Sequence, residues 1–79
     1  MPKQREVYHV VHESDANAWK VEKEGSLRAI TRTETKEPAV SAAKKLAKSA
    51  SLGQVIIHRK DGSIQEEFTY GEDPRDTPG

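Results

Sequence analysis

Residues 36–51 carry alanines and a leucine at the spacing of one helix face, and the small size of these side chains limits how the chain can pack. The apolar positions recur every three or four residues: Ala39, Ala42, Ala43, Leu46 and Ala50. This period predicts an amphipathic helix, with Thr35 as its N-cap, Pro38 in its first turn and Gly53 placed to cap its C-terminal end. Because alanine is short, we expect the helix to lie close against a sheet.

The segments on both sides of this helix have the composition of β-strands. Five runs are β-branched, aromatic or alternating: residues 6–12, 18–24, 27–33, 54–59 and 63–70. The last two are joined by Lys60-Asp61-Gly62, and Asp-Gly between two strand-like runs is a strong hairpin signal. The sequence therefore predicts a two-layer α+β fold of order β-β-β-α-β-β, an antiparallel sheet with one helix packed on one face.

Two registers of the last hairpin distribute its side chains differently. A two-residue loop pairs Ile57 with Glu66 and collects an apolar stripe on one face: Val55, Ile57, Ile64, Phe68 and Tyr70. The same register leaves three side chains on the solvated face: His58, Gln65 and Glu67. A three-residue loop with a glycine bulge pairs His58 with Ile64 instead and scatters the apolar residues. Burial favours the first register.

The chain has 79 residues, of which 33% are hydrophobic and 33% charged, and this is enough for one thin core. We expect an N-terminal extension at 1–5, a single domain at 6–70 and a disordered acidic tail at 71–79. Cysteine is absent, which removes disulfides and thiolate chemistry. No segment approaches the ~20 apolar residues of a membrane span, so a cytoplasmic location is expected.

The three histidines and the carboxylates do not form a recognisable catalytic or metal-binding motif. His9 and His12 stand three apart in one predicted strand and so point to opposite faces. No HExxH, GxSxG or SxxK pattern is present, and no two glycines have the spacing of a phosphate loop. We therefore expect a non-enzymatic protein with no catalytic residues, no metal site and no cofactor.

Charge is balanced over the whole chain but unevenly placed along it. Residues 35–60 carry six basic and one acidic side chain, whereas residues 61–79 carry one basic and six acidic. A nucleic-acid-binding hypothesis would use five basic side chains: Arg28, Arg32, Lys44, Lys45 and Lys48. The net charge of zero argues against it, and pairing of the two arginines with Glu22 or Glu24 across the sheet is an alternative.

A protein-interaction hypothesis uses the sheet face that the helix leaves open. Alternation places two apolar residues, Ile30 and Ile56, on the side that otherwise reads as polar. The candidate interaction face consists of these two with their neighbours: Ile30, Ile56, His58, Arg28 and Arg32. The function favoured by the sequence is thus an interaction module that binds a protein partner or itself through the open sheet face or an edge strand.

The sequence also resembles a bacterial family of small uncharacterised proteins, domain of unknown function 2188. The resemblance rests on YHVV (8–11), AWKVEKEGSLRA (18–29), the helix start at Thr35–Ala39 and VIIHRKDGSIQEEFTYGEDP (55–74). Pro38 departs from the family, which usually has an acidic residue there. The resemblance implies the same element order and a bacterial or phage setting, and it brings no activity or catalytic residue.

Overall fold

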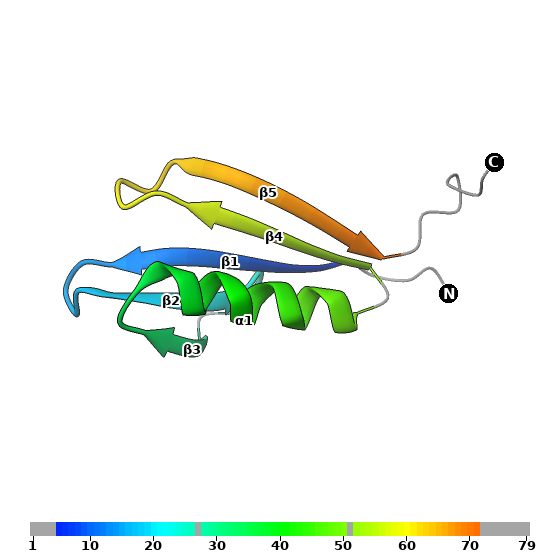
Figure 1. The fold of residues 1–79 in the computed structure, drawn as a ribbon, viewed down its shortest axis with the longest axis horizontal. Coiled ribbons are helices and arrows are strands. Elements are labelled where there is room, and N and C mark those ends of the chain that lie inside the picture. Colours follow the sequence, from blue (N-terminus) through cyan, green and yellow to red (C-terminus); the bar gives the residue numbers. More distant parts are fainter. Residues whose placement is uncertain (1–4, 27, 51, 72–79) are drawn as a thin grey trace.

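The computed structural model describes residues 5–26, 28–50 and 52–71 of the chain, and its elements follow the predicted order. They are β1 (Glu6–Glu13), β2 (Ala18–Lys23), β3 (Ala29–Thr33), α1 (Lys36–Ser49), β4 (Leu52–His58) and β5 (Ile64–Gly71). All five strands belong to one sheet, and α1 lies across one of its faces (Figure 1). The α+β class and the two layers are confirmed, and most of the tail predicted at 71–79 lies outside the described residues.

The strands are ordered β3-β2-β1-β4-β5, which places the first strand in the centre. Three of the neighbouring pairs are antiparallel, but β1 and β4 are parallel, with Val10 opposite Ile57. The prediction of a purely antiparallel sheet is therefore wrong at its central pair. The reason is the connection: α1 carries the chain back along the sheet, so β4 enters in the same direction as β1.

The core lies between α1 and the three central strands. It consists of nine buried residues: Tyr8, Val10, Trp19, Val21, Ala39, Ala43, Ala47, Val55 and Ile57. The helix contributes only alanines to this set, whereas Ala42 and Leu46 pack at its edge. Small side chains on α1 allow it to approach the valines of the sheet closely, as the alanine stripe predicted.

Gly53 does not cap the helix, in contrast to the prediction. The helix ends at Ser49, and Ala50 follows in an extended conformation, donating its N–H to the Ala47 oxygen at 3.2 Å. Gly53 instead lies in β4 directly beneath the last turn of α1. A Cβ atom at this position would come within 3.0 Å of three backbone atoms of Ala47. Glycine is required here because the strand and the helix backbone touch.

A bulge in β3 changes the direction of Ile30. Thr31 pairs with Val21 and Ala29 with Glu22, so Ile30 is the extra residue between them. Ile30 lines a shallow apolar hollow on the helix side of the molecule, together with Ala42, Leu46 and other residues of α1, and it is 47% exposed. The regular alternation assumed from the sequence fails at this residue.

A second bulge combines the two registers considered for the hairpin of β4 and β5. Away from the turn Val55 pairs with Phe68 and Ile57 with Glu66, as in the favoured register. At the turn His58 pairs with Ile64, as in the alternative. Between them Gln65 is extra, and its side chain accepts a hydrogen bond from Lys36 of α1. Ile64 therefore leaves the predicted core stripe and is 49% exposed.

The turn itself is fixed by local hydrogen bonds. Gly62 has a positive φ of 95° and donates its N–H to the Arg59 oxygen, while Arg59 donates to the Ser63 oxygen. Asp61 Oδ1 accepts from the Ser63 N–H at 2.9 Å and from its hydroxyl at 2.7 Å. These bonds hold the pKa of Asp61 below its ordinary value of 3.8.

Candidate functional site on the open sheet face

The sheet face opposite α1 has no covering element among the described residues. Tyr8 and Val10 of β1 point to the helix, so the alternate residues of β1 point away from it. We call this surface the open face and define it by its members: Val7, His9, Val11, Glu13, Lys20, Glu22, Arg32, Gln54, Ile56, His58, Ile64 and Glu67. It combines apolar, charged and imidazole side chains on all five strands.

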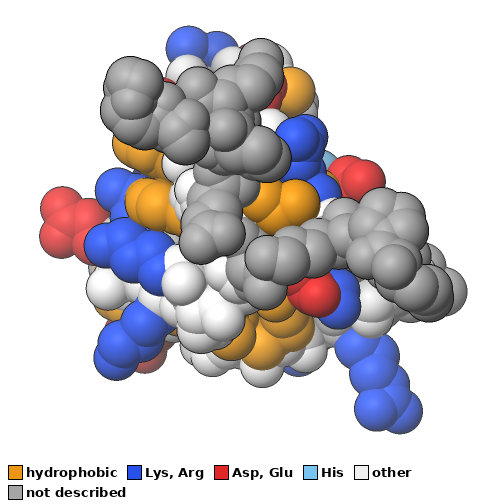
Figure 2. All heavy atoms as spheres, turned by 90° about the vertical axis from the view of Figure 1, so that its right-hand side faces the viewer, with side chains coloured by type: hydrophobic (Ala, Val, Ile, Leu, Met, Phe, Trp, Pro, Cys, Tyr) orange, Lys and Arg blue, Asp and Glu red, His pale blue; other side chains and the backbone are white. Residues whose placement is uncertain are grey.

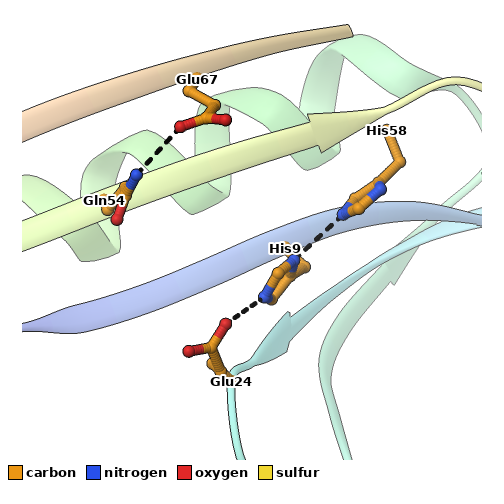
Figure 3. Close-up of polar contacts among 5 residues, drawn as sticks. All are labelled: His9, Glu24, Gln54, His58 and Glu67. Carbon is orange, nitrogen blue, oxygen red and sulfur yellow. Dashed lines mark hydrogen bonds and ion pairs between the residues drawn. The ribbon is translucent and has the colours of Figure 1, made fainter. Parts of the chain in front are cut away.

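Two histidines meet at the middle of the open face (Figure 3). His9 lies on β1 opposite Ile56 of β4, and His58 is two residues further along β4. His9 Nδ1 and His58 Nε2 are 3.0 Å apart, which is hydrogen-bonding distance. The parallel pairing of β1 with β4 is what brings together two side chains 49 positions apart.

The outer nitrogens of both rings are also occupied. His9 Nε2 is 2.9 Å from Oε1 of Glu24, the residue that follows β2. His58 Nδ1 is 3.0 Å from the carbonyl oxygen of Gly62 in the hairpin turn. The result is a continuous chain of polar contacts across three strands, from a carboxylate through two imidazoles to a backbone carbonyl. Figure 3 shows the first two of these contacts.

The other charged groups of the open face are mostly paired with one another. Lys20 Nζ is 3.1 Å from Glu22 Oε2, and Arg32 Nε is 3.0 Å from Glu13 Oε1. The hydrogen bond from Arg32 lowers the pKa of Glu13 below its ordinary value of 4.5. Pairs at the surface, even half-buried ones, add little to stability, but they balance the charge of the open face.

The structure brings together only part of the predicted interaction face. Ile56 and His58 lie on the open face, whereas Ile30 lies on the helix side. Arg28 is exposed just before β3 begins. Arg32 is on the open face but is held by Glu13, not by Glu22 or Glu24 as the sequence suggested. Ile30 and Ile56 therefore do not form one apolar patch.

The basic residues of the nucleic-acid hypothesis lie on different sides of the molecule. Lys44 Nζ is 4.1 Å from the ring centroid of Phe68, and Lys48 Nζ is 5.5 Å from that of Tyr70, both beside β5. Lys45 lines the hollow around Ile30, beside β3. At the end of the molecule shown in Figure 2, lysine and arginine side chains are spread around the outline and do not gather into one patch.

His9 and His12 point to opposite faces of the sheet, as the sequence predicted. His12 packs edge-on against Trp19 on the helix side, 5.0 Å between ring centroids, so it cannot share a ligand with His9. Within the described ranges no group of three or more histidine, cysteine or acidic side chains has an arrangement suited to a metal ion. Sequence reasoning missed the His9–His58 contact because it depends on which strands are neighbours, and no local pattern reports that.

Among the described residues no helix is long and apolar enough to cross a membrane. No curated protein matches this sequence, and no solved structure matches it either. One family model does match, over residues 8–70, which includes nearly all of the sheet, the helix and both histidines of the open face. The chain therefore belongs to the bacterial family of uncharacterised conserved proteins known as DUF2188.

Proposed function

We propose that this chain is a small non-enzymatic interaction module in which the open faces of two copies pack against each other. The observation that carries the proposal is the set of three apolar side chains, Val7, Val11 and Ile56, which surround His9 on the two central strands on the side away from α1. Two antiparallel or mixed sheets commonly pack face to face at about 10 Å, burying such residues between them. A second copy would supply the layer that one copy lacks.

The charges of the open face suit a second copy of the same chain. Both signs are present and adjacent, as in the pairs Lys20–Glu22 and Arg32–Glu13, and the chain as a whole has zero net charge. A face of one sign would repel its copy, whereas a balanced face can meet itself about a two-fold axis.

The edges of the sheet are less suitable than its face. Edge strand β3 has only five residues, and both edge strands carry a bulge, at Ile30 and at Gln65. The other edge, β5, adds adjacent glutamates at 66 and 67. Short length, bulges and like charge are the features that keep sheet edges from pairing with other chains.

We propose a non-enzymatic role because both outer ring nitrogens of the histidine pair already have partners. Its contacts end on the carboxylate of Glu24 and on the carbonyl of Gly62, so neither ring faces a hydroxyl that it could activate. The pair is thus better suited to organising the surface than to proton transfer with a substrate.

The test is sedimentation velocity of the full chain from micromolar to millimolar concentration, with a matched pair of variants. Ile64→Lys changes the open face and Ile30→Lys changes the helix side, at residues that are 49% and 47% exposed. Completing the burial of a half-exposed isoleucine is worth about 1 kcal/mol, and a two-fold dimer contains it twice. We expect Ile64→Lys to weaken the dimer roughly thirtyfold and Ile30→Lys to leave it unchanged.

A parent chain that stays monomeric over the whole range would overturn the proposal. So would a dimer that Ile30→Lys weakens and Ile64→Lys does not, because the interface would then lie on the helix side. Titration of labelled duplex DNA at two salt concentrations completes the test. Binding that falls steeply with salt would support the nucleic-acid hypothesis in its place.

A further inference from the structure

The histidine pair on the open face allows its protons to be counted from its contacts. Each ring nitrogen either carries a proton and donates, or is bare and accepts. His9 and His58 have four ring nitrogens, and all four have a polar partner: Glu24, Gly62 and each other. The chemistry of the two outer partners fixes the state of the outer nitrogens.

Both outer nitrogens must donate. The carbonyl oxygen of Gly62 can only accept, so His58 Nδ1 carries a proton. The carboxylate of Glu24 likewise accepts, so His9 Nε2 carries one. Two neutral rings have only these two protons between them, and the facing nitrogens, His9 Nδ1 and His58 Nε2, would then both be bare lone pairs 3.0 Å apart.

The central contact is satisfied only by one further proton. With a third proton, one inner nitrogen donates and the other accepts, and all three contacts become hydrogen bonds. With a fourth, the two inner nitrogens both carry protons and repel. We propose that His9 and His58 form a binding site for a single shared proton, so that the two rings carry one positive charge between them.

The geometry of the contact suits a proton better than a metal ion. The ring centroids are 5.2 Å apart and the facing nitrogens 3.0 Å apart. The difference is about the width of one imidazole ring, that is, half a ring on each side of the contact. The nitrogens therefore point almost straight at each other, as in a linear N–H···N bond. A metal ion on that line would need the nitrogens about 4 Å apart, given Zn–N bonds of about 2.0–2.1 Å.

The surroundings of the pair supply negative charge close to the shared proton. The charged groups around it are Lys20 and Glu22 on β2, Glu24 just after β2, and Glu67 on β5, with Arg59 and Asp61 in the adjoining hairpin turn. Lys20 is taken up by Glu22, and Arg59 donates to the Ser63 hydroxyl and to the Ile64 carbonyl. Glu24 is the charge in direct contact, and it compensates the imidazolium.

The shared proton adds a side-chain link between the two central strands, which are already joined by backbone hydrogen bonds. His9 belongs to β1 and His58 to β4, so the bond spans the parallel pair. The contact is attractive only in the singly charged form, and it weakens when the proton leaves or when a second one is added. This inference goes beyond self-association, because it concerns a single copy and holds whether or not two copies pack together.

The test is side-chain NMR of the uniformly ¹⁵N-labelled full chain, with EDTA present, over the pH range in which the chain is folded. We expect protons on His9 Nε2 and on His58 Nδ1 at the same pH, and one strongly deshielded proton coupled to the two inner nitrogens. His58→Phe and His9→Phe should each lose the deshielded signal.

His12 provides the control, since it meets Trp19 and no second imidazole. His12→Phe should leave the signals of the pair unchanged. The inference is overturned if the parent shows no deshielded proton coupled to both inner nitrogens anywhere in this pH range, or if that signal persists in either single variant. It is also overturned if coupling between the two rings is seen only after EDTA has been removed and equimolar Zn²⁺ has been added. The parent spectrum alone decides the question if a variant does not fold.

Discussion

Substitution of Gly53 by alanine should destabilise the chain strongly for its size. The added Cβ would come within 3.0 Å of the backbone of Ala47, and backbone atoms cannot move aside as the end of a flexible side chain can. Overpacking of this kind costs about 1–3 kcal/mol, and loss of unfolded-state entropy returns about 0.4–1 kcal/mol. We expect a net loss of about 1–2 kcal/mol. This is a large part of the roughly 4–12 kcal/mol of total stability that 0.05–0.15 kcal/mol per residue gives for 79 residues.

The assay is urea unfolding followed by the fluorescence of Trp19, the single tryptophan, which is buried against the core. Gly53→Val separates the packing argument from local preference. Valine has a higher β-propensity than glycine, so propensity alone predicts that Gly53→Val stabilises the chain. Packing predicts the opposite, with a greater loss of stability than for Gly53→Ala. The reasoning is refuted if Gly53→Ala leaves the free energy of unfolding unchanged, or if Gly53→Val is the more stable of the two.

Three further predictions follow from the core and the surface pairs. Ala43→Leu should cost about 1–3 kcal/mol in urea unfolding, because Ala43 is fully buried against the sheet, whereas Ser41→Leu on the exposed side should change the free energy by under about 0.5 kcal/mol. The lowered pKa of Asp61 means that its stabilisation is present above about pH 4 and is lost as pH falls through that pKa; the stability difference between the parent and Asp61→Asn should therefore shrink on acidification, and a constant difference would contradict this. Arg32→Gln should raise the pKa of Glu13 toward 4.5 in a carboxyl NMR titration, with no change if Arg32 is not its partner in solution.

The parts of the fold that depend on neighbouring residues could be predicted from the sequence. The alanine period located α1 to within two residues at its C-terminal end, and Thr35 is the residue that precedes the helix. Asp61-Gly62 marked the hairpin turn, and the alternation of Trp19 with Val21 marked a strand with one buried face. In each case the pattern spans only one element and its turn.

The parts that depend on distant residues could not be predicted. The path of α1 and the packing of the core decide which strand lies beside β1. The parallel pairing of β1 with β4 could therefore not be predicted from local sequence patterns. The two bulges reversed Ile30 and Ile64, since one extra residue turns a side chain to the other face. The contact of His9 with His58 then followed from strand order alone, and the sequence shows only two isolated histidines.

The central position of the parallel pair also sets the order in which the chain can assemble. β1, β2 and β3 form one local unit and β4 with β5 forms another, while β1 and β4 can join only after the helix between them has been traversed. Closing so long a loop is entropically costly, so we expect this joining to be the slow step of folding. During synthesis one edge of β1 stays unpaired until residues 52–58, which form β4, have emerged. In this interval β1 exposes apolar side chains on both faces, at Val7, Val10 and Val11. A chain that stopped before β4 would keep that edge permanently, and strand-to-strand aggregation is the outcome expected for it.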